Sequence, residues 1–235
     1  MIKQTVFATS QDQTKPILMG ELLEIENGNI NLVAIDGYRF AVRSCQVDNL
    51  IHEDLKAKII IPGKTLIDVN SLLSSEEEVK VGFNEKNAIF IINDTKIVTR
   101  LLEGEFIDYK KLCPREYNSK IKLKTKDLLN SIERASLLSQ SEQNNLIKLS
   151  IRDSMMAITS NNEKGNVYEE VALSLEGDYL DIAFNSRYLL EGLKNIDCEE
   201  IYIEFTTNVN PCIIKPADGT KYTYLLLPVR ISSNN

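Results

Sequence analysis

The sequence predicts an α+β protein made of two similar domains in tandem, each with two helices packed on antiparallel β-sheets. The main observation is an internal repeat. Pro62 in IIIPGKTLIDVNSLL aligns with Asn185 in DIAFNSRYLLEGLKNI at an offset of 123 residues. Asp36, which ends VAID, aligns with Thr159, which ends MAIT, at the same offset, and EVKVGF aligns with EIYIEF at 122. Because solenoid repeats have periods of about 20–50 residues, each copy here should be a whole domain with its own core.

In the first half, β-branched residues and alternating apolar positions predict seven strands: ILMGELLEIE, INLVAI, RFAVRSCQV, KAKIIIP, EEVKVGF, AIFIIN and KIVTRLLEGEF. The Asn27-Gly28 pair between the first two strands predicts a tight hairpin. PGKTLIDVNSLLSS predicts a helix that begins near Pro62. Its apolar stripe at helical spacing consists of Leu66, Ile67, Val69, Leu72 and Leu73.

The second half predicts a similar order of elements. KIKLKT is a strand, and KDLLNSIERASLLSQ is a helix with an apolar face of Leu128, Leu129, Ile132, Ala135 and Leu138. The strands NLIKLSI, MMAITS, NVYEEVALSL and DYLDIAF follow, then the helix SRYLLEGLKNI and the strands EEIYIEF, PCIIKPA and KYTYLLLPVRI. CPREYNSK, with Pro114, has no apolar period and is typical of a linker. We therefore expect domains at 1–114 and 115–235.

The repeat also indicates that the first domain is incomplete. A strand and most of a helix precede Arg134, whose counterpart is about Gln4, and only three residues precede Gln4. We therefore expect the first domain to begin inside its first helix, without its opening strand, as in part of a longer protein.

Composition excludes several classes of protein. No apolar run approaches the roughly 18 residues of a membrane span, and no signal peptide precedes the first helix, so no membrane partner and a cytoplasmic location are expected. Cys45, Cys113, Cys198 and Cys212 form no CxxC pair, and His52 is the only histidine, so we expect reduced thiols and neither a metal site nor a cofactor.

An enzyme is the competing class, because Asp36, Glu103, Glu105 and Asp108 could supply paired carboxylates. No phosphate loop, nucleophile elbow, metal triad or Ser/His/Asp set accompanies them. The sequence therefore predicts no catalytic residues.

Five segments together resemble a known family. VAIDGYRFAV, RLLEGEFIDYKKLCP, RASLLS, NSRYLLEGLK and YLLLPVRI are similar to segments of the beta subunit of bacterial DNA polymerase III, the sliding clamp, and occur in that family's order. The resemblance implies tandem clamp domains, the middle and C-terminal domains of a three-domain protomer. In that family two protomers close head to tail into a ring of six domains around duplex DNA, which the homodimer holds nonspecifically and topologically. The ring tethers polymerase without catalysing a reaction, and it is associated with the nucleoid.

The resemblance also implies a groove between the two domains that binds a short linear peptide motif. The polymerase catalytic subunit, the clamp loader and repair polymerases carry this motif, which has a glutamine and paired apolar or aromatic residues. By motif, the groove residues are Leu18, Ile35, Gly37, Tyr38, Arg39, Phe40, Ile107, Lys111, Leu112, Tyr188, Val209, Pro211, Leu225, Leu226, Leu227, Pro228, Val229 and Arg230. Arg39 or Arg230 would offer charge at the rim, and the apolar floor would consist of Leu18, Phe40, Leu112, Val209, Leu225, Leu227 and Val229. Tyr38, Phe40, Ile107 and Lys111 stand where many members have histidine, leucine, proline and arginine, which changes the shape of the pocket.

The predicted helices are less acidic than the rest of the chain, which suits a ring whose helices face DNA. The formal net charge is −7, but the predicted helices at 1–10, 62–72, 124–140 and 185–195 together carry +3, which leaves −10 for the remainder. Many tight phosphate contacts would resist movement along DNA, whereas topological capture needs little affinity. The candidate DNA-facing residues are Lys3, Lys64, Arg134, Arg187 and Lys194. The alternative is a duplicated protein-interaction module that does not act on DNA, in which these are ordinary solvated helix residues.

Overall fold

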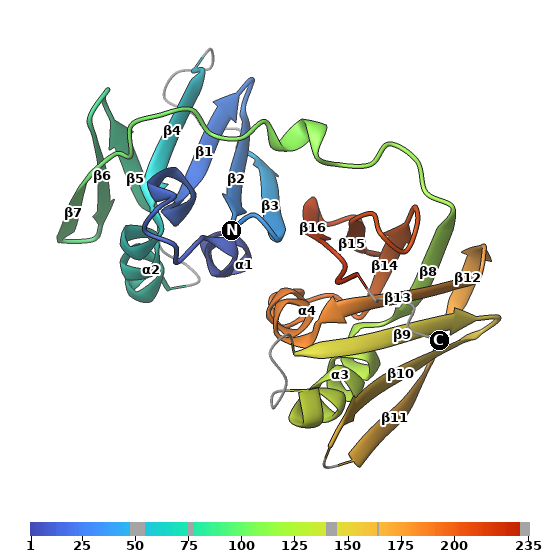
Figure 1. Cartoon of the computed structure of the whole chain (residues 1–235). Helices are drawn as coiled ribbons and strands as arrows, with labels where there is room; N and C mark the ends of the chain where they lie inside the picture. Colours follow the sequence, from blue (N-terminus) through green and yellow to red (C-terminus); the bar gives the residue numbers. More distant parts are fainter. Residues whose placement is uncertain (48–54, 75–77, 140–144, 164, 231–235) are drawn as a thin grey trace. The chain divides into compact units, whose positions relative to one another are not determined.

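The chain folds into two compact units, Met1–Asp108 and Tyr109–Asn235, in a computed structural model. The structure describes residues 1–47, 55–74, 78–139, 145–163 and 165–230, and His52 lies outside them. The units divide at Asp108, whereas the sequence places the boundary after Pro114. Tyr109, the first residue of the second unit, is buried and begins a short 3-10 helix. Figure 1 labels the helices and strands of both units.

The first unit contains two antiparallel sheets. Its elements are α1 (Ile2–Thr5), η1 (Val6–Ala8), η2 (Pro16–Met19), β1 (Gly20–Glu26), β2 (Asn29–Ile35), β3 (Arg39–Gln46), β4 (Ala57–Pro62), α2 (Gly63–Leu72), β5 (Val79–Phe83), β6 (Asn87–Ile92) and β7 (Thr95–Arg100). One sheet has the order β3-β2-β1-β4 and the other β5-β6-β7. The predicted hairpin at Asn27-Gly28 is confirmed: both residues have positive φ, 51° and 73°, and Glu26 pairs with Asn29.

Helix α2 covers the core of the first unit. Leu66 and Val69 are buried in a cluster with Leu32, Ile61, Ala88, Phe90, Ile92 and Leu101. The predicted apolar stripe is too wide, because Ile67 and Leu72 are exposed and Leu73 follows the helix. Ile67 is one position beyond Leu66, which turns its side chain about 100° away from the sheet.

The second unit repeats this architecture with more strands. Its elements are η3 (Tyr109–Lys111), β8 (Ser119–Lys124), α3 (Thr125–Ser139), β9 (Leu146–Arg152), β10 (Met155–Asn162), β11 (Gly165–Ala172), β12 (Ser174–Gly177), β13 (Leu180–Asn185), α4 (Ser186–Leu193), β14 (Glu200–Phe205), β15 (Cys212–Pro216) and β16 (Tyr222–Leu226). One sheet has the order β11-β10-β9-β13, and the strands β12-β8-β14-β15-β16 are neighbours in the other. Helices α3 and α4 pack against each other.

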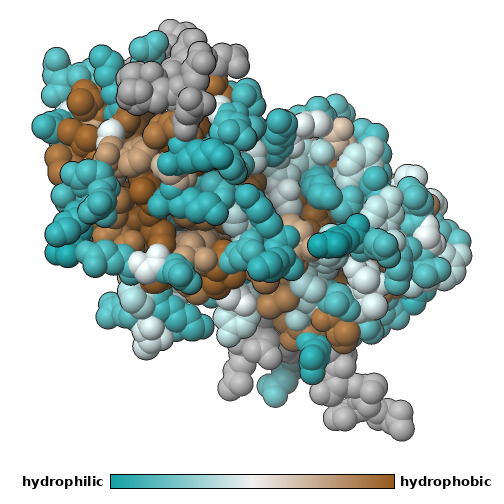
Figure 2. All heavy atoms as spheres, turned by 90° about the horizontal axis from the view of Figure 1, so that it is seen from above, coloured by the Kyte–Doolittle hydropathy of each residue, from teal (hydrophilic) through white to brown (hydrophobic). Residues whose placement is uncertain are grey.

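Each strand of the first unit has a counterpart in the second unit. The order β3-β2-β1-β4 matches β11-β10-β9-β13, and β4 with α2 matches β13 with α4 at the offset of 123. Strand β14 pairs with β8 on one side, whereas its counterpart β5 pairs only with β6 among the described residues. Consequently Val81 is 42% exposed, while the matching Ile203 is 2% exposed. Hydrophobic residues at the surface of the first unit appear in brown at the left of Figure 2.

The helices of both units are short. Within the part of the chain that the structure describes, no helix is long and apolar enough to cross a membrane.

Candidate functional site

The last strand of the second unit, β16, continues into a tail at residues 227–230, which a backbone hydrogen bond holds in place. In β16, Tyr224 and Leu226 are fully buried, whereas Leu227, just after the strand, is 38% exposed. The backbone N–H of Val229 donates to the carbonyl oxygen of Ala183 in β13 at 2.8 Å. The tail is therefore held beside β13, directly before α4 begins.

Helix α4 is joined to the same strand. The side chain of Asn185 accepts hydrogen bonds from the N–H groups of Arg187 at 3.0 Å and Tyr188 at 3.3 Å, which caps the helix. The hydroxyl of Tyr224 donates to the backbone carbonyl of Tyr188 at 2.7 Å. Gly192 leaves room for the Tyr224 ring, since a Cβ there would lie 2.2 Å from its Cε1 atom.

Two further predicted residues lie at the end of β15. Cys212 pairs with Leu226, so Pro211 and Leu227 stand at the same end of the two strands. Val209, which is 55% exposed, is held in its loop by a hydrogen bond from its N–H to the Thr207 hydroxyl at 3.3 Å. We call this part of the second unit the tail site, and it comprises Tyr188, Val209, Pro211, Leu227, Pro228 and Val229.

The remaining predicted groove residues of the second unit differ in exposure. Leu112, after η3, is exposed, as are Lys111 and Arg230. Leu225 is almost completely buried, and the side chain of Leu226 is 0% exposed. Both residues therefore belong to the core and are not available to a ligand in this structure.

In the first unit, the β2–β3 turn holds Arg39 firmly. Asp36 Oδ1 accepts from the N–H groups of Tyr38 at 2.8 Å and Arg39 at 3.1 Å, while its Oδ2 lies 2.9 Å from the Arg39 Nε. Gly37 has φ of +99°, a conformation that favours glycine. Arg39 also donates to the carbonyl of Phe7 at 2.9 Å, and its guanidinium lies 5.3 Å from the Phe7 ring. Arg39 is thus 6% exposed and interacts inside the unit, which differs from the expected position at a rim.

The other first-unit residues fall into two groups. Tyr38 and Ile107 are exposed, whereas Ile35 and Phe40 are buried. Leu18 is also buried, and it lies in the 3-10 helix η2 rather than in the predicted strand. Pro16 begins this helix, and its fixed φ favours a helical turn there.

The predicted DNA-facing cations differ between the units. Arg134 forms two hydrogen bonds with the Glu169 carboxylate, at 2.8 and 2.6 Å, and these lower the pKa of Glu169. Arg187 pairs with Glu191 at 2.8 Å, and Lys194 of the α4 cap pairs with Glu133 of α3 at 2.8 Å. In the first unit, Lys3 and Lys64 are exposed, and no ion pair joins either to another described residue.

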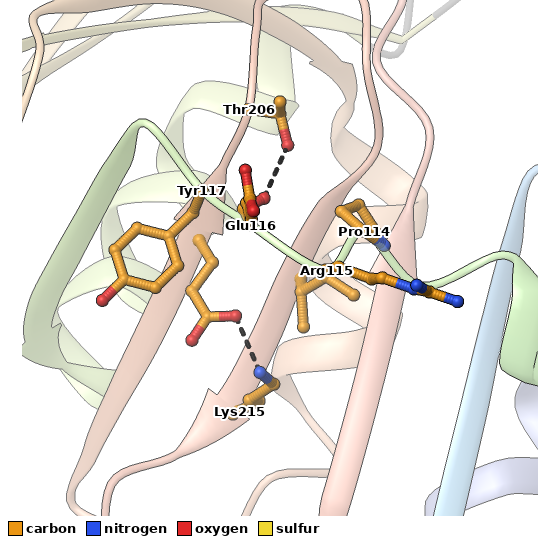
Figure 3. A pocket seen from close by; sticks show the side chains of 8 residues that line it. Pro114, Arg115, Glu116, Tyr117, Thr206 and Lys215 are labelled. Carbon is orange, nitrogen blue, oxygen red and sulfur yellow. Dashed lines mark hydrogen bonds and ion pairs between the residues drawn. The ribbon is translucent and has the colours of Figure 1, made fainter.

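The sequence did not predict a cavity of about 150 Å³ within the second unit (Figure 3). In it, Lys215 pairs with Glu204 at 2.7 Å, and the Thr206 hydroxyl donates to the carbonyl of Glu116 at 3.2 Å. Its lining is Pro114, Arg115, Glu116, Tyr117, Glu204, Thr206, Ile213 and Lys215. Pockets for small molecules usually measure about 300–1,000 Å³. This cavity is therefore closer in size to a single side chain, and it shares no residue with the predicted groove.

A metal site needs several ligand side chains close together. No group of three or more His, Cys, Asp or Glu residues in the described ranges could hold a metal ion. The four cysteines are all free thiols.

Family models match both units. Residues 1–108 match the central domain of the DNA polymerase III beta subunit, and residues 110–230 match its C-terminal domain. The chain is 37% identical over 233 residues to the beta sliding clamp of Staphylococcus epidermidis, and 36% identical to that of Staphylococcus aureus. Each match covers 98% of this chain and 61% of the relative, so the chain spans less than two thirds of their length.

Solved structures agree with these matches. The DNA polymerase sliding clamp from Bacillus subtilis superposes with a TM-score of 0.94 at 35% identity, covering 98% of this chain and 61% of that one. A sliding clamp from Pseudomonas aeruginosa bound to griselimycin has a TM-score of 0.92 at 26% identity, with coverage of 98% and 62%.

Proposed function

This chain belongs to the family of the DNA polymerase III beta subunit, and we propose that it works as part of a sliding clamp. In this role it is a noncatalytic processivity factor that encircles duplex DNA as a homodimer of full-length protomers. It tethers the replicative polymerase and other replication and repair proteins through a peptide-binding groove. The two family domains in their order, and relatives that match 98% of the chain, support this proposal.

The tail site is the observation that carries the peptide-binding proposal. It presents the exposed Leu227 and Val209 beside prolines, on a backbone that the hydrogen bonds of Tyr224 and Val229 hold in place. A rigid apolar surface loses little entropy when a ligand binds. Burial of an apolar anchor contributes about 1.5–3 kcal/mol. Two such anchors, offset by the ordering of a flexible peptide, suggest an affinity near micromolar.

Weak peptide binding suits the proposed role. Partners that share one site must exchange, and residence times shorten as affinity falls. We propose that the polymerase catalytic subunit, the clamp loader and repair polymerases all use this site. The Pseudomonas aeruginosa relative, whose structure contains griselimycin, is a clamp of the same fold that binds a ligand.

Two of the four candidate carboxylates, Asp36 in the β2–β3 turn and Glu103 after β7, support a noncatalytic role. Asp36 caps its own turn and pairs with Arg39, and Glu103 pairs with Arg100 at 3.0 Å. Both carboxylates therefore have structural partners. A clamp that acts on chromosomal DNA would work in the cytoplasm, in association with the nucleoid.

A binding experiment tests the proposal. A fluorescent peptide of the type glutamine-leucine-x-leucine-phenylalanine should bind the chain, as measured by fluorescence anisotropy. Leu227→Ala should weaken binding by at least about fivefold, because it removes most of an apolar anchor. Leu137→Ala is the matched control, since Leu137 is an exposed leucine on α3 of the same unit. Equal affinity of wild type and Leu227→Ala would refute the assignment of the tail site.

A further inference from the structure

Two exposed cations of the second unit, Arg187 and Lys194, form ion pairs with neighbouring carboxylates. Arg187, Glu191 and Lys194 follow one another at i, i+4 and i+7, so they lie on one face of α4 and its C-terminal cap. Lys194 reaches Glu133 on the adjacent helix α3 at 2.8 Å. The side chains of Lys194 and Glu133 are both about half exposed, so solvent and other ions reach the pair.

We propose that Glu133 and Glu191 limit the affinity of this helix pair for DNA by competing with phosphate for Lys194 and Arg187. This inference rests on the proposed function, because it takes the exposed face of α3 and α4 as the side that meets duplex DNA. A phosphate that approaches either cation competes with a carboxylate that already neutralises part of its charge. The gain in energy from each phosphate contact is therefore smaller than it would be at an unpaired cation.

The internal repeat gives a comparison within the same chain. Lys64 of α2 occupies the position that matches Arg187, and Asp68 occupies the position that matches Glu191. Asp68 has the shorter side chain, and no ion pair joins it to Lys64 in the described part of the chain. The competing carboxylates are thus a feature of the second unit.

The magnitude of the effect suits a sliding protein. Exposed ion pairs are weak, so each one should reduce the affinity for a phosphate by only about 1.5-fold to fivefold. Strong contacts with many phosphates would hold the protein in place and make binding steeply dependent on salt. Competition from Glu133 and Glu191 keeps Lys194 and Arg187 exposed to DNA but lowers the affinity of each cation for a phosphate.

The test is the affinity of the whole chain for a fluorescein-labelled linear duplex at low salt, measured by anisotropy. The double substitution Glu133→Gln and Glu191→Gln should raise affinity about threefold to tenfold. The slope of log K against log salt should steepen by about 0.9 for each additional phosphate that the protein neutralises. Removing two negative charges anywhere on the protein would also raise its affinity for DNA. The double substitution Glu85→Gln and Glu176→Gln is therefore the control. Both glutamates are exposed, and neither belongs to α3 or α4.

A double-mutant cycle isolates the pair itself. Glu133→Gln should no longer raise the affinity for DNA when Lys194 is also replaced by alanine, because Glu133 then has no ammonium group to pair with. An equal rise in affinity in the control variant, an undiminished rise with Lys194→Ala, or no rise at all would each overturn the inference. The glutamine substitutions do not touch the tail site, so peptide binding, measured on the same samples, reports separately on the proposed function.

Discussion

The Tyr224 hydroxyl donates a 2.7 Å hydrogen bond to the backbone carbonyl oxygen of Tyr188. Tyr224 is fully buried in β16, and Tyr188 lies in the first turn of α4. This bond connects the strand that leads into Leu227 to the helix that carries Tyr188. Two parts of the tail site, far apart in the sequence, are positioned by it.

Tyr224→Phe should remove this bond and leave the Tyr188 carbonyl with one partner fewer. We expect the free energy of unfolding to fall by about 1 kcal/mol, as measured by urea denaturation. Peptide affinity should fall as well, because Tyr188 and Leu227 lose a common support. Unchanged stability and unchanged affinity together would show that the bond has no role in positioning the site.

Gly192→Ala should destabilise the protein, although the substitution adds only a methyl group. A Cβ at this position would lie 2.2 Å from Tyr224 Cε1, and the ring is fully buried. We expect a loss of about 1–3 kcal/mol of stability from overpacking, although alanine normally favours a helix over glycine. Ser71→Ala is an exposed helical control, which removes one hydroxyl bond to the Asp68 carbonyl and should change stability little. An increase in the melting temperature of Gly192→Ala would contradict the close approach.

The repeat provides a matched pair of core substitutions. Ile203 and Val81 occupy equivalent strand positions. Ile203 is flanked on both sides, by β8 and β15, whereas among the described residues Val81 is flanked only by β6. Ile203→Ala should therefore cost about 2–5 kcal/mol. Val81→Ala should cost less than about 1 kcal/mol, since the half-exposed side chain buries less apolar area. Similar losses from both substitutions, measured by urea denaturation, would contradict this difference in burial.

Glu21 should make the first unit less stable as pH rises. Its side chain is buried in β1, and neither carboxylate oxygen has a partner at good hydrogen-bond geometry among the described residues. Burial raises its pKa to about 8, an effect that the nearby Thr5 hydroxyl only partly opposes. The unfolded chain should have the ordinary pKa of 4.5. Between these values the folded state binds one proton more than the unfolded state, so the free energy of unfolding falls with rising pH, by about 5 kcal/mol at most. Above pH 8 both states have lost the proton, and the loss of stability is complete.

Glu21→Gln should remove this pH dependence, because glutamine stays neutral. The stability of Glu21→Gln relative to wild type should increase between pH 5 and pH 8.5 in urea denaturation. A difference that does not change with pH would show that Glu21 does not hold its proton in the folded protein.

Much of the fold could be predicted because its signals are local. The Asn27-Gly28 turn, the apolar face of α3 at Leu128 and Ile132, and the repeat itself all follow from neighbouring residues. The Arg187–Glu191 pair also follows from its i, i+4 spacing.

Other features depend on contacts between distant segments. Glu21 lies beside two consecutive leucines, so strand alternation does not reveal that its carboxylate is buried. The pairing of Lys194 with Glu133 joins two helices, and no sequence spacing indicates it. Likewise, the burial of Arg39 depends on Phe7, which belongs to another element of the unit.

Nuclear magnetic resonance of leucine and valine methyl groups tests the central claim most directly. On titration with the glutamine-leucine-x-leucine-phenylalanine peptide, the methyl signals of Leu227 and Val209 should shift, while those of Leu137 stay unchanged. Shifts confined to Ile213 and the cavity around it, with isoleucine methyls labelled in the same sample, or no shifts at millimolar peptide, would contradict a peptide-binding tail site.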